Sequence, residues 1–135
     1  MGVCQVSAHR KLAAILFADI VGYTRQMNAD EVKGLERRRE FEQLARSVAA
    51  SHSGRVIKMI GDAAMLEFES AVEAVSAALA LQRQMTELDE QLGTAGQLRV
   101  RVGVHIGDVV EEDGDLYGNA VNIAQRVHGI AAPGG

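Results

Sequence analysis

Apolar residues follow two patterns along the chain, short continuous runs and longer stretches in which they recur every three or four positions. The run KLAAILFADI predicts a strand buried on both faces, and residues 30–52 carry a helical stripe. By these criteria the predicted strands are residues 11–20, 55–60, 64–68 and 98–110, and the predicted helices are residues 23–27, 30–52, 71–91 and 117–130.

Capping and turn residues mark several boundaries. Asn28 precedes Glu31 by three positions and Ser70 precedes Glu73 by three, which is the spacing of a capping box at the start of a helix. The tripeptide at 61–63, Gly-Asp-Ala, separates two apolar runs and predicts a hairpin turn.

The order of these elements indicates an α+β fold. It is strand, helix, strand, strand, helix, strand, then a turn and a helix, which is typical of a ferredoxin-like βαββαβ sandwich with helices on one face of an antiparallel sheet, plus a C-terminal helix. The first strand of that topology lies beside the third. We therefore expect Asp19, at the end of the first strand, to lie close to Asp62 in the hairpin turn.

Composition agrees with one ordinary globular domain. The 135 residues are 47% hydrophobic and 24% charged, which allows a single modest core. The net charge of −4 argues against nucleic acid or anionic lipid as partners. No apolar run approaches the ~18 residues of a membrane span. The single cysteine, Cys4, excludes an internal disulfide and fits a cytoplasmic location.

The two ends of the chain are expected to differ from its middle. Residues 1–10 contain no apolar segment of a signal peptide and are predicted to form a flexible arm, so the folded domain is expected to span residues 11–135. The chain stops at AAPGG, a turn signal, so we expect it to lack a C-terminal segment of its domain.

Two aspartates are candidates for metal binding. Asp19 lies within the apolar stretch ILFADIVGYT, where an ionised carboxylate requires a partner. If Asp62 is its neighbour, a cation is needed to keep both ionised, and oxygen ligands favour Mg²⁺ or Mn²⁺ completed by water and substrate phosphates. The alternative is an ordinary turn aspartate beside a strand-end aspartate that caps the next helix.

Other polar residues interrupt apolar patterns. Lys58 alternates in phase with Val56 and Ile60, so it either has a partner or is an edge lysine that discourages strand pairing. Asn122 and Arg126 share one helix face, where an amide and a guanidinium suit a phosphate-like anion, or else form a solvated pair.

Several common sites are missing from the sequence. It has no Gly-rich phosphate loop of either the GxxxxGK[ST] or the GxGxxG type. The four histidines are scattered and predict no catalytic constellation; they are His9, His52, His105 and His128.

Taken together, the motifs resemble the catalytic domain of bacterial class III adenylyl/guanylyl cyclases. The resemblance covers residues 11–135 and rests on LFADIVGYT, VIKMIGDAAMLEF, RVGVHIGDVV and GDLYGNAVNIAQR, in that order. Each motif alone is weak, and the four in the family's order and spacing are specific.

The resemblance implies a role for each matching residue. Asp19 and Asp62 match the two metal aspartates, with the carbonyl of Ile20 as a further ligand. Lys58 and Asp115 match the pair that reads the purine, and lysine with aspartate is the adenylyl type. Adenine offers an N6 donor for the carboxylate and an N1 acceptor for the ammonium.

The remaining matches concern the ribose and the phosphates. Asn122 and Arg126 match the pair that orients the ribose and stabilises charge on the α-phosphate. Phe17 and the segment Gly22, Tyr23 and Thr24 would line the triphosphate side. The implied general base is left open between Asp19, water and a substrate phosphate.

The implied activity is that of an adenylyl cyclase, which converts ATP to 3′,5′-cyclic AMP and pyrophosphate. The resemblance also implies two Mg²⁺ or Mn²⁺ ions in each site and a homodimer with two shared sites. In such a dimer one chain supplies the metal aspartates, and its partner supplies Lys58, Asp115, Asn122 and Arg126.

Family domains continue beyond the position of Gly135 with a further lysine that binds the triphosphate. The alternative is therefore a truncated, non-catalytic module for dimerisation or nucleotide binding. A diguanylate cyclase is disfavoured because the turn lacks the GG[DE]EF sequence.

Overall fold

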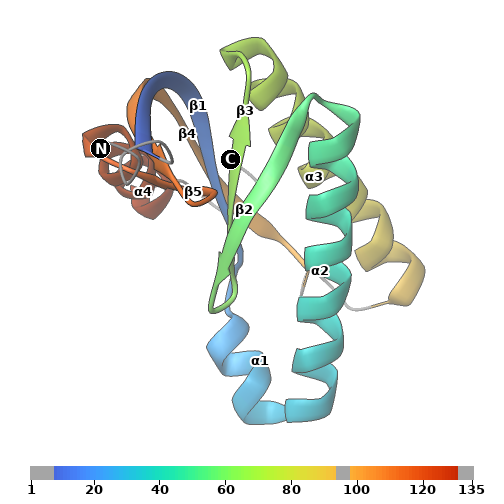
Figure 1. Ribbon diagram of the computed structural model, residues 1–135. Helices are drawn as coiled ribbons and strands as arrows, with labels where there is room; N and C mark the ends of the chain where they lie inside the picture. Colours follow the sequence, from blue (N-terminus) through green and yellow to red (C-terminus); the bar gives the residue numbers. More distant parts are fainter. Residues whose placement is uncertain (1–7, 94–97, 131–135) are drawn as a thin grey trace.

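The computed structural model describes residues 8–93 and 98–130 (Figure 1). The strands are β1 (Ala8–Ile20), β2 (Gly54–Ile60), β3 (Ala63–Phe68), β4 (Val100–Glu112) and β5 (Asp115–Tyr117). The helices are α1 (Tyr23–Ala29), α2 (Glu31–Ser51), α3 (Ala71–Leu92) and α4 (Asn119–Ile130). No helix in these ranges is long and apolar enough to cross a bilayer.

The predicted α+β fold is confirmed. The strands form one antiparallel sheet in the order β2-β3-β1-β4-β5, so β1 lies beside β3 as expected. The sheet is strongly curled, with α2 and α3 on one face and α4 on the other (Figure 1). The curl brings β2 near β5, although these are the two outer strands.

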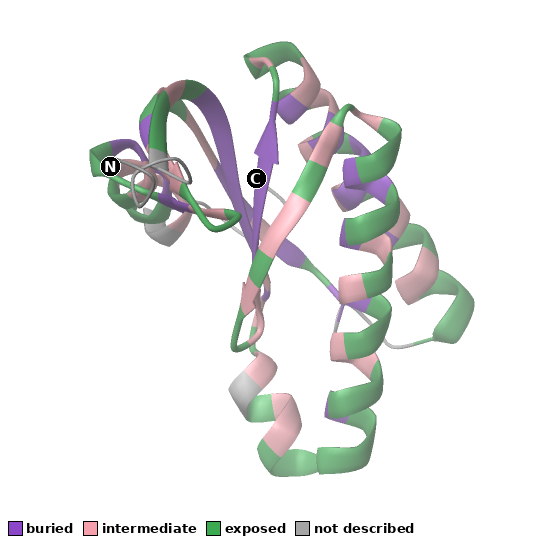
Figure 2. Cartoon of the chain, viewed as in Figure 1, coloured by how far each residue is buried: buried purple, intermediate pink, exposed green. Residues whose placement is uncertain are grey.

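Each face of the sheet has its own core, and the alternation of side chains along β1 separates them. The larger one, which we call the helix-pair core, lies under α2 and α3 and includes Leu16, Ile20, Phe41, Phe68, Leu81 and Met85. The smaller one, the α4 core, consists of Ala13, Ile15, Phe17, Met65, Val109, Leu116, Ala120 and Ala124. Strand β3 and the second half of β1 are accordingly buried over most of their length (Figure 2).

One of the two predicted capping boxes is confirmed at its cap. The hydroxyl of Ser70 accepts a hydrogen bond from the Glu73 amide at 3.1 Å. The prediction for Asn28 was wrong, because that residue lies inside α1. The cap of α2 is Asp30, whose carboxylate accepts from the Lys33 amide at 3.2 Å.

Two boundaries also differ from the prediction. Residues 8–10 belong to β1 and pair with β4, so the predicted flexible arm at residues 1–10 is wrong there, and residues 1–7 lie outside the described residues.

The strand β5 was not predicted. It follows a two-residue turn, Asp113-Gly114, in which both φ angles are positive (53° and 83°), as in the tight turns of twisted hairpins.

A bulge in β2 changes the face to which its side chains point. Val56 pairs with Leu66, but Lys58 pairs with the next residue back, Met65, so the register shifts by one at Ile57. Leu66 belongs to the helix-pair core and Met65 to the α4 core. Lys58 therefore lies on the α4 face, and the predicted phase with Val56 was wrong.

Candidate active site

Asp19 lies at the end of β1 between an arginine from β4 and a histidine from α4. Its Oδ2 accepts a hydrogen bond from Nη2 of Arg101 at 3.2 Å, and its Oδ1 lies 3.2 Å from Nε2 of His128. The Asp19 side chain is only 14% exposed. The carboxylate in the apolar stretch is thus paired, although the sequence indicated neither partner.

This pairing leaves polar atoms unsatisfied. Among the described residues, Oδ1 of Asp19, Nε2 of His128 and Nε of Arg101 are buried and make no hydrogen bond. The Asp19–His128 contact is close without hydrogen-bond geometry. A buried carboxylate oxygen without a donor is costly in the protein alone and fits a site that a cation completes.

Asp62 lies at the same end of the sheet. Asp19 pairs across the ladder with Ala63, the residue that follows Asp62, so the topology brings the two aspartates together as predicted. Among the described residues no group of three or more His, Cys, Asp or Glu side chains is placed to hold a metal. Two carboxylates fit Mg²⁺ or Mn²⁺, which take water and phosphate oxygens as further ligands.

Helix α4 packs unusually close to β4. A Cβ built on Gly103 would lie 2.2 Å from the backbone nitrogen of His128, so only glycine permits this approach. Ala120 and Ala124, small residues four apart, are buried at the same interface. Gly103 therefore sets the position of His128 against Asp19.

Asn122 and Arg126 lie on the opposite side of α4. Both are exposed, in agreement with the prediction that they share a face directed away from the core. An exposed amide and guanidinium one turn apart can bind one anionic group.

Lys58 and Asp115 are in direct contact, although they belong to the two outer strands of the sheet. Nζ of Lys58 donates to Oδ2 of Asp115 at 2.7 Å, and Oδ1 of Asp115 accepts from the Leu116 amide at 2.8 Å. The hydrogen bond from Lys58 is the main cause that lowers the pKa of Asp115 below its ordinary value, against the opposing effect of burial. Asp115 is therefore ionised at neutral pH.

The residues expected to line the triphosphate side differ in accessibility, and Gly22 is the exposed one among those described. Phe17 is 3% exposed and belongs to the α4 core, with its ring 6.4 Å from that of His128. Tyr23 packs against the helix-pair core. Gly22 caps α1 in a left-handed conformation, and the side chain of Ile20 is buried. The side chain of Thr24 lies outside the described part of the structure.

Residues 6–135 match the family described as the adenylate and guanylate cyclase catalytic domain. The chain belongs to this family. It is 44% identical over 131 residues to a protein of Rhizobium meliloti. The aligned region is 96% of this chain and 22% of that protein. It is also 34% identical over 119 residues to an adenylate cyclase of Streptomyces coelicolor. That aligned region is 87% of this chain and 30% of that protein.

Solved structures agree with this assignment to the cyclases. The adenylate/guanylate cyclase/hydrolase from Silicibacter pomeroyi superposes with a TM-score of 0.84 at 38% identity, over 94% of this chain and 74% of that one. The adenylyl cyclase CyaB of P. aeruginosa superposes with a TM-score of 0.83 at 21% identity, over 94% of this chain and 76% of that one, and shows the fold alone. The chain spans only 22% and 30% of the two curated relatives.

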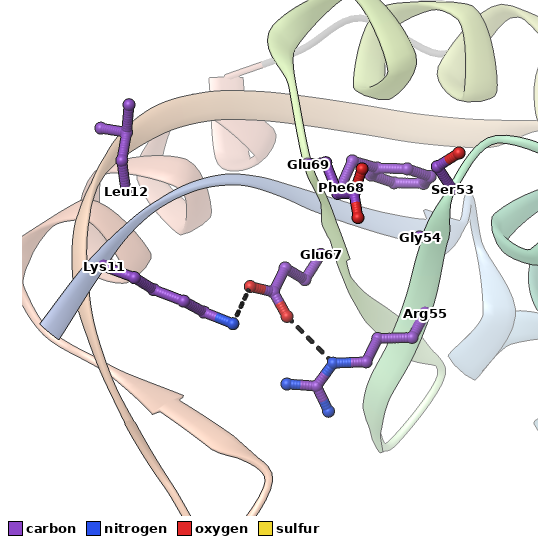
Figure 3. A pocket seen from close by; sticks show the side chains of 8 residues that line it. All are labelled: Lys11, Leu12, Ser53, Gly54, Arg55, Glu67, Phe68 and Glu69. Carbon is purple, nitrogen blue, oxygen red and sulfur yellow. Dashed lines mark hydrogen bonds and ion pairs between the residues drawn. The ribbon is translucent and has the colours of Figure 1, made fainter. Parts of the chain in front are cut away.

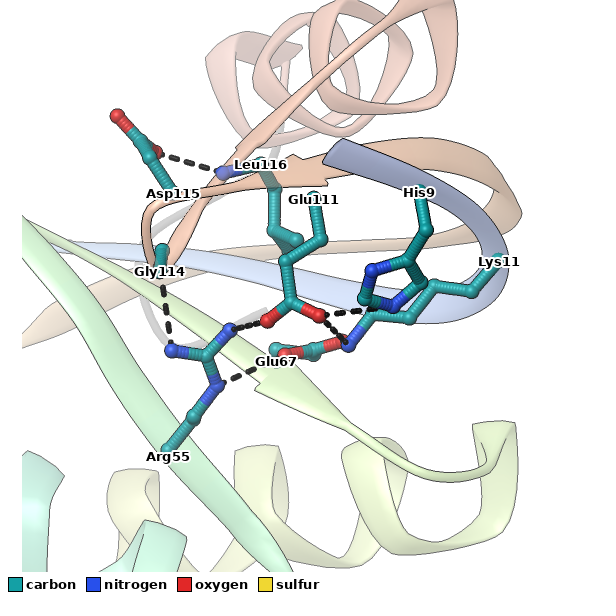
Figure 4. Close-up of polar contacts among 8 residues, drawn as sticks. All are labelled: His9, Lys11, Arg55, Glu67, Glu111, Gly114, Asp115 and Leu116. Carbon is teal, nitrogen blue, oxygen red and sulfur yellow. Dashed lines mark hydrogen bonds and ion pairs between the residues drawn. The ribbon is translucent and has the colours of Figure 1, made fainter. Parts of the chain in front are cut away.

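The cyclase domain also contains an ion-pair network that was not predicted from its sequence. Glu67 on β3 is 8% exposed and binds Lys11 at 2.7 Å and Arg55 at 2.9 Å (Figure 3). These three residues line an open cavity of about 640 Å³. Glu111 on β4 binds the same two cations and also His9 (Figure 4).

The network shifts the pKa values of its members. Burial alone would lower the pKa of Lys11, but hydrogen bonds to Glu67 and Glu111 outweigh it and raise that pKa. The hydrogen bond from Lys11 is in turn the main reason why the pKa of Glu111 is lowered. The network could not be found from spacing, because its members come from four strands.

Proposed function

We propose that this domain converts ATP to 3′,5′-cyclic AMP and pyrophosphate. The observation that carries the proposal is the 2.7 Å contact between Lys58 and Asp115. This contact places an ammonium donor beside an ionised carboxylate acceptor. On adenine, the N1 acceptor suits the ammonium of Lys58, and the neighbouring N6 donor suits the carboxylate of Asp115. The name of the Streptomyces relative, adenylate cyclase, supports the same substrate.

We assign metal binding to Asp19 and Asp62, with the Ile20 carbonyl as a further ligand. The unsatisfied Oδ1 of Asp19 supports this assignment. Two bound Mg²⁺ or Mn²⁺ ions would lower the pKa of the ribose 3′-hydroxyl and hold the triphosphate. In this role Oδ1 of Asp19, which now lies against His128, would bind the cation.

Asn122 and Arg126 act on the ribose and the α-phosphate in this proposal. The amide of Asn122 orients the ribose so that its 3′-oxygen attacks the α-phosphorus in line with the leaving pyrophosphate. Arg126 lies one turn further along α4 and binds charge that grows on the α-phosphate in the transition state. Phe17 supports this region from the core, and Gly22 to Thr24 are assigned to the triphosphate side.

A homodimer completes the site in our proposal. Asn122 and Arg126 are exposed, so they are free to face a second chain. One chain supplies Asp19 and Asp62, and its partner supplies Lys58 and Asp115 together with the α4 pair. A two-fold axis then creates two identical composite sites. We place this activity in the cytoplasm, where ATP is available.

The function is tested by measuring cyclic nucleotides formed from ATP and from GTP with Mg²⁺ or Mn²⁺. We expect cyclic AMP from ATP in preference to GTP, and loss of turnover in Asp19→Ala and Asp62→Ala while both variants stay folded. Asp108→Ala, an exposed aspartate of β4, is the matched control and should keep its activity. A folded protein that binds ATP but forms no product would favour the non-catalytic module.

The shared site is tested by mixing two inactive variants, Asp19→Ala and Arg126→Ala. Random pairing makes about half of the dimers heterodimers, each with one intact site, so activity should return to roughly a quarter of the wild type. Heterodimers that form without any recovery of activity would place the whole site within one chain.

A further inference from the structure

Arg55 joins three parts of the sheet through one guanidinium (Figure 4). Its Nε donates to Glu67 on β3 at 2.9 Å, its Nη2 to Glu111 on β4 at 2.7 Å, and its Nη1 to the carbonyl of Gly114 at 3.1 Å. Every nitrogen of the Arg55 side chain therefore donates a hydrogen bond. The buried carboxylate of Glu67 fixes the orientation of the planar guanidinium.

The carbonyl that Arg55 binds belongs to the residue directly before Asp115. The turn at 113–114 is followed by only a short strand, with the three ladder pairs of β4 and β5. Lys58 stands three residues after Arg55 on β2 and reaches Asp115 from the same side. Two adjacent contacts therefore connect β2 to the β4–β5 turn across the curled sheet.

We propose that Arg55 is a positioning residue for purine recognition, which holds the β4–β5 turn so that the carboxylate of Asp115 meets Lys58. The inference rests on the proposed function, because only that function makes Lys58 and Asp115 the pair that recognises adenine. In this proposal Arg55 does not bind the substrate itself. It acts through Asp115 and changes the choice of base more than the chemical step.

The bonding pattern explains why another cation cannot replace it. A lysine at position 55 could keep the charge beside Glu67, but its single nitrogen cannot also bind Glu111 and the Gly114 carbonyl in a fixed fork. Arg55→Lys thus removes the hold on the turn while it keeps a cation beside the buried carboxylate. Arg55→Gln removes both.

The first measurement needs no nucleotide. Carbon-detected NMR titration gives the pKa of the Asp115 carboxyl, which is low chiefly because Lys58 binds it. We expect that pKa to rise toward the ordinary aspartate value in Arg55→Lys and in Arg55→Gln. Arg46→Gln is the control, because Arg46 hydrogen-bonds to Glu42 on the exposed surface of α2, away from Asp115.

The second measurement is kinetic. We expect the KM for ATP to rise about 10-fold in Arg55→Lys, with kcat within about twofold, and the preference for ATP over GTP to fall. In an Asp115→Asn background the same substitution should add almost nothing, because both changes act on one contact. A merely structural role would lower the melting temperature and kcat without this dependence on Asp115.

The outcomes separate the two proposals. Unchanged Asp115 pKa and unchanged KM in a folded Arg55→Lys variant would overturn the role of Arg55. If the wild type forms no cyclic AMP, the proposed function fails, and the NMR titration still decides whether Arg55 holds Asp115 against Lys58. If Arg55→Gln does not fold, Arg55→Lys alone gives the answer.

Discussion

The two faces of the sheet are built for different tasks. Under α2 and α3, large apolar side chains such as Phe41 and Phe68 are almost completely buried. Under α4 the core is small, and charged groups with incomplete hydrogen bonding, above all Asp19, stand at its edge. The first face is packed with large apolar side chains, whereas the second carries buried polar atoms without hydrogen-bond partners, including the carboxylate to which we assign metal binding.

The largest effect is expected on the helix-pair face. Phe41→Ala removes a fully buried ring and should lower the free energy of unfolding by about 3–5 kcal/mol. Chemical denaturation measures this loss. The fraction that stays folded should keep its cyclase activity per molecule, and a large change in that specific activity would show that the two faces are coupled.

On the α4 face we expect a loss of activity instead. Gly103→Val drives side-chain atoms into the backbone of α4 at His128 and should reduce turnover by about 100-fold, because a small misplacement of catalytic groups is enough. Gly107→Ala is a milder companion, since its Cβ would lie 2.9 Å from the Cβ of Ala120. Hydrogen exchange along α4 checks the displacement. If Gly103→Val is as active as Gly107→Ala, the close packing of α4 against β4 does not control turnover.

A third change sharpens the comparison on the α4 face alone. Lys58→Glu combined with Asp115→Cys removes both groups that fit adenine and should reduce the ATP-to-GTP preference by roughly 10- to 100-fold. Neither side chain belongs to a core, so the thermal midpoint should move little. Initial rates with both nucleotides give the result. Unaltered preference would remove these residues from base recognition.

The smallest effect concerns pH. The lowered pKa of Glu111 means that the unfolded chain binds this proton more readily, so the network's contribution is complete above the ordinary value of 4.5 and is lost as pH falls through the lower folded value. Glu111→Gln should cost within about 1 kcal/mol at neutral pH and progressively less in acid. Denaturation series at several pH values test this trend, and a penalty that grows in acid would contradict it.

The sequence predicted those contacts that follow from topology. The βαββαβ order sets β1 beside β3, which brings Asp19 and Asp62 to one end of the sheet without further information. All eight strands and helices predicted from the apolar pattern agree with the structure to within three residues at each end, and the agreement is within one residue for β2, β3, α2 and α3.

Contacts that depend on the curl of the sheet, on bulges and on exact register could not be predicted from the pattern of apolar residues. Lys58 and Asp115 could be paired only by resemblance to the family, because the bulge at Ile57 and the curvature that brings β2 to β5 leave no periodic signal. His128 is one of four histidines that the sequence alone assigns to no site. Its spacing of four and eight from Ala124 and Ala120 marks one face of α4, which is the signal that could have singled it out.

The central position of β1 also has a consequence for how the protein is made. Within this domain β1 is synthesised before the other strands, but its partners are residues 63–68 and 100–112. At about 5–20 residues per second, an apolar strand therefore waits several seconds for its second neighbour. Contacts this distant in sequence slow folding in general, so we expect the nascent chain to be exposed to aggregation during that time. Within the domain, the segment that carries Asp19 is thus synthesised before both of the strands that enclose it.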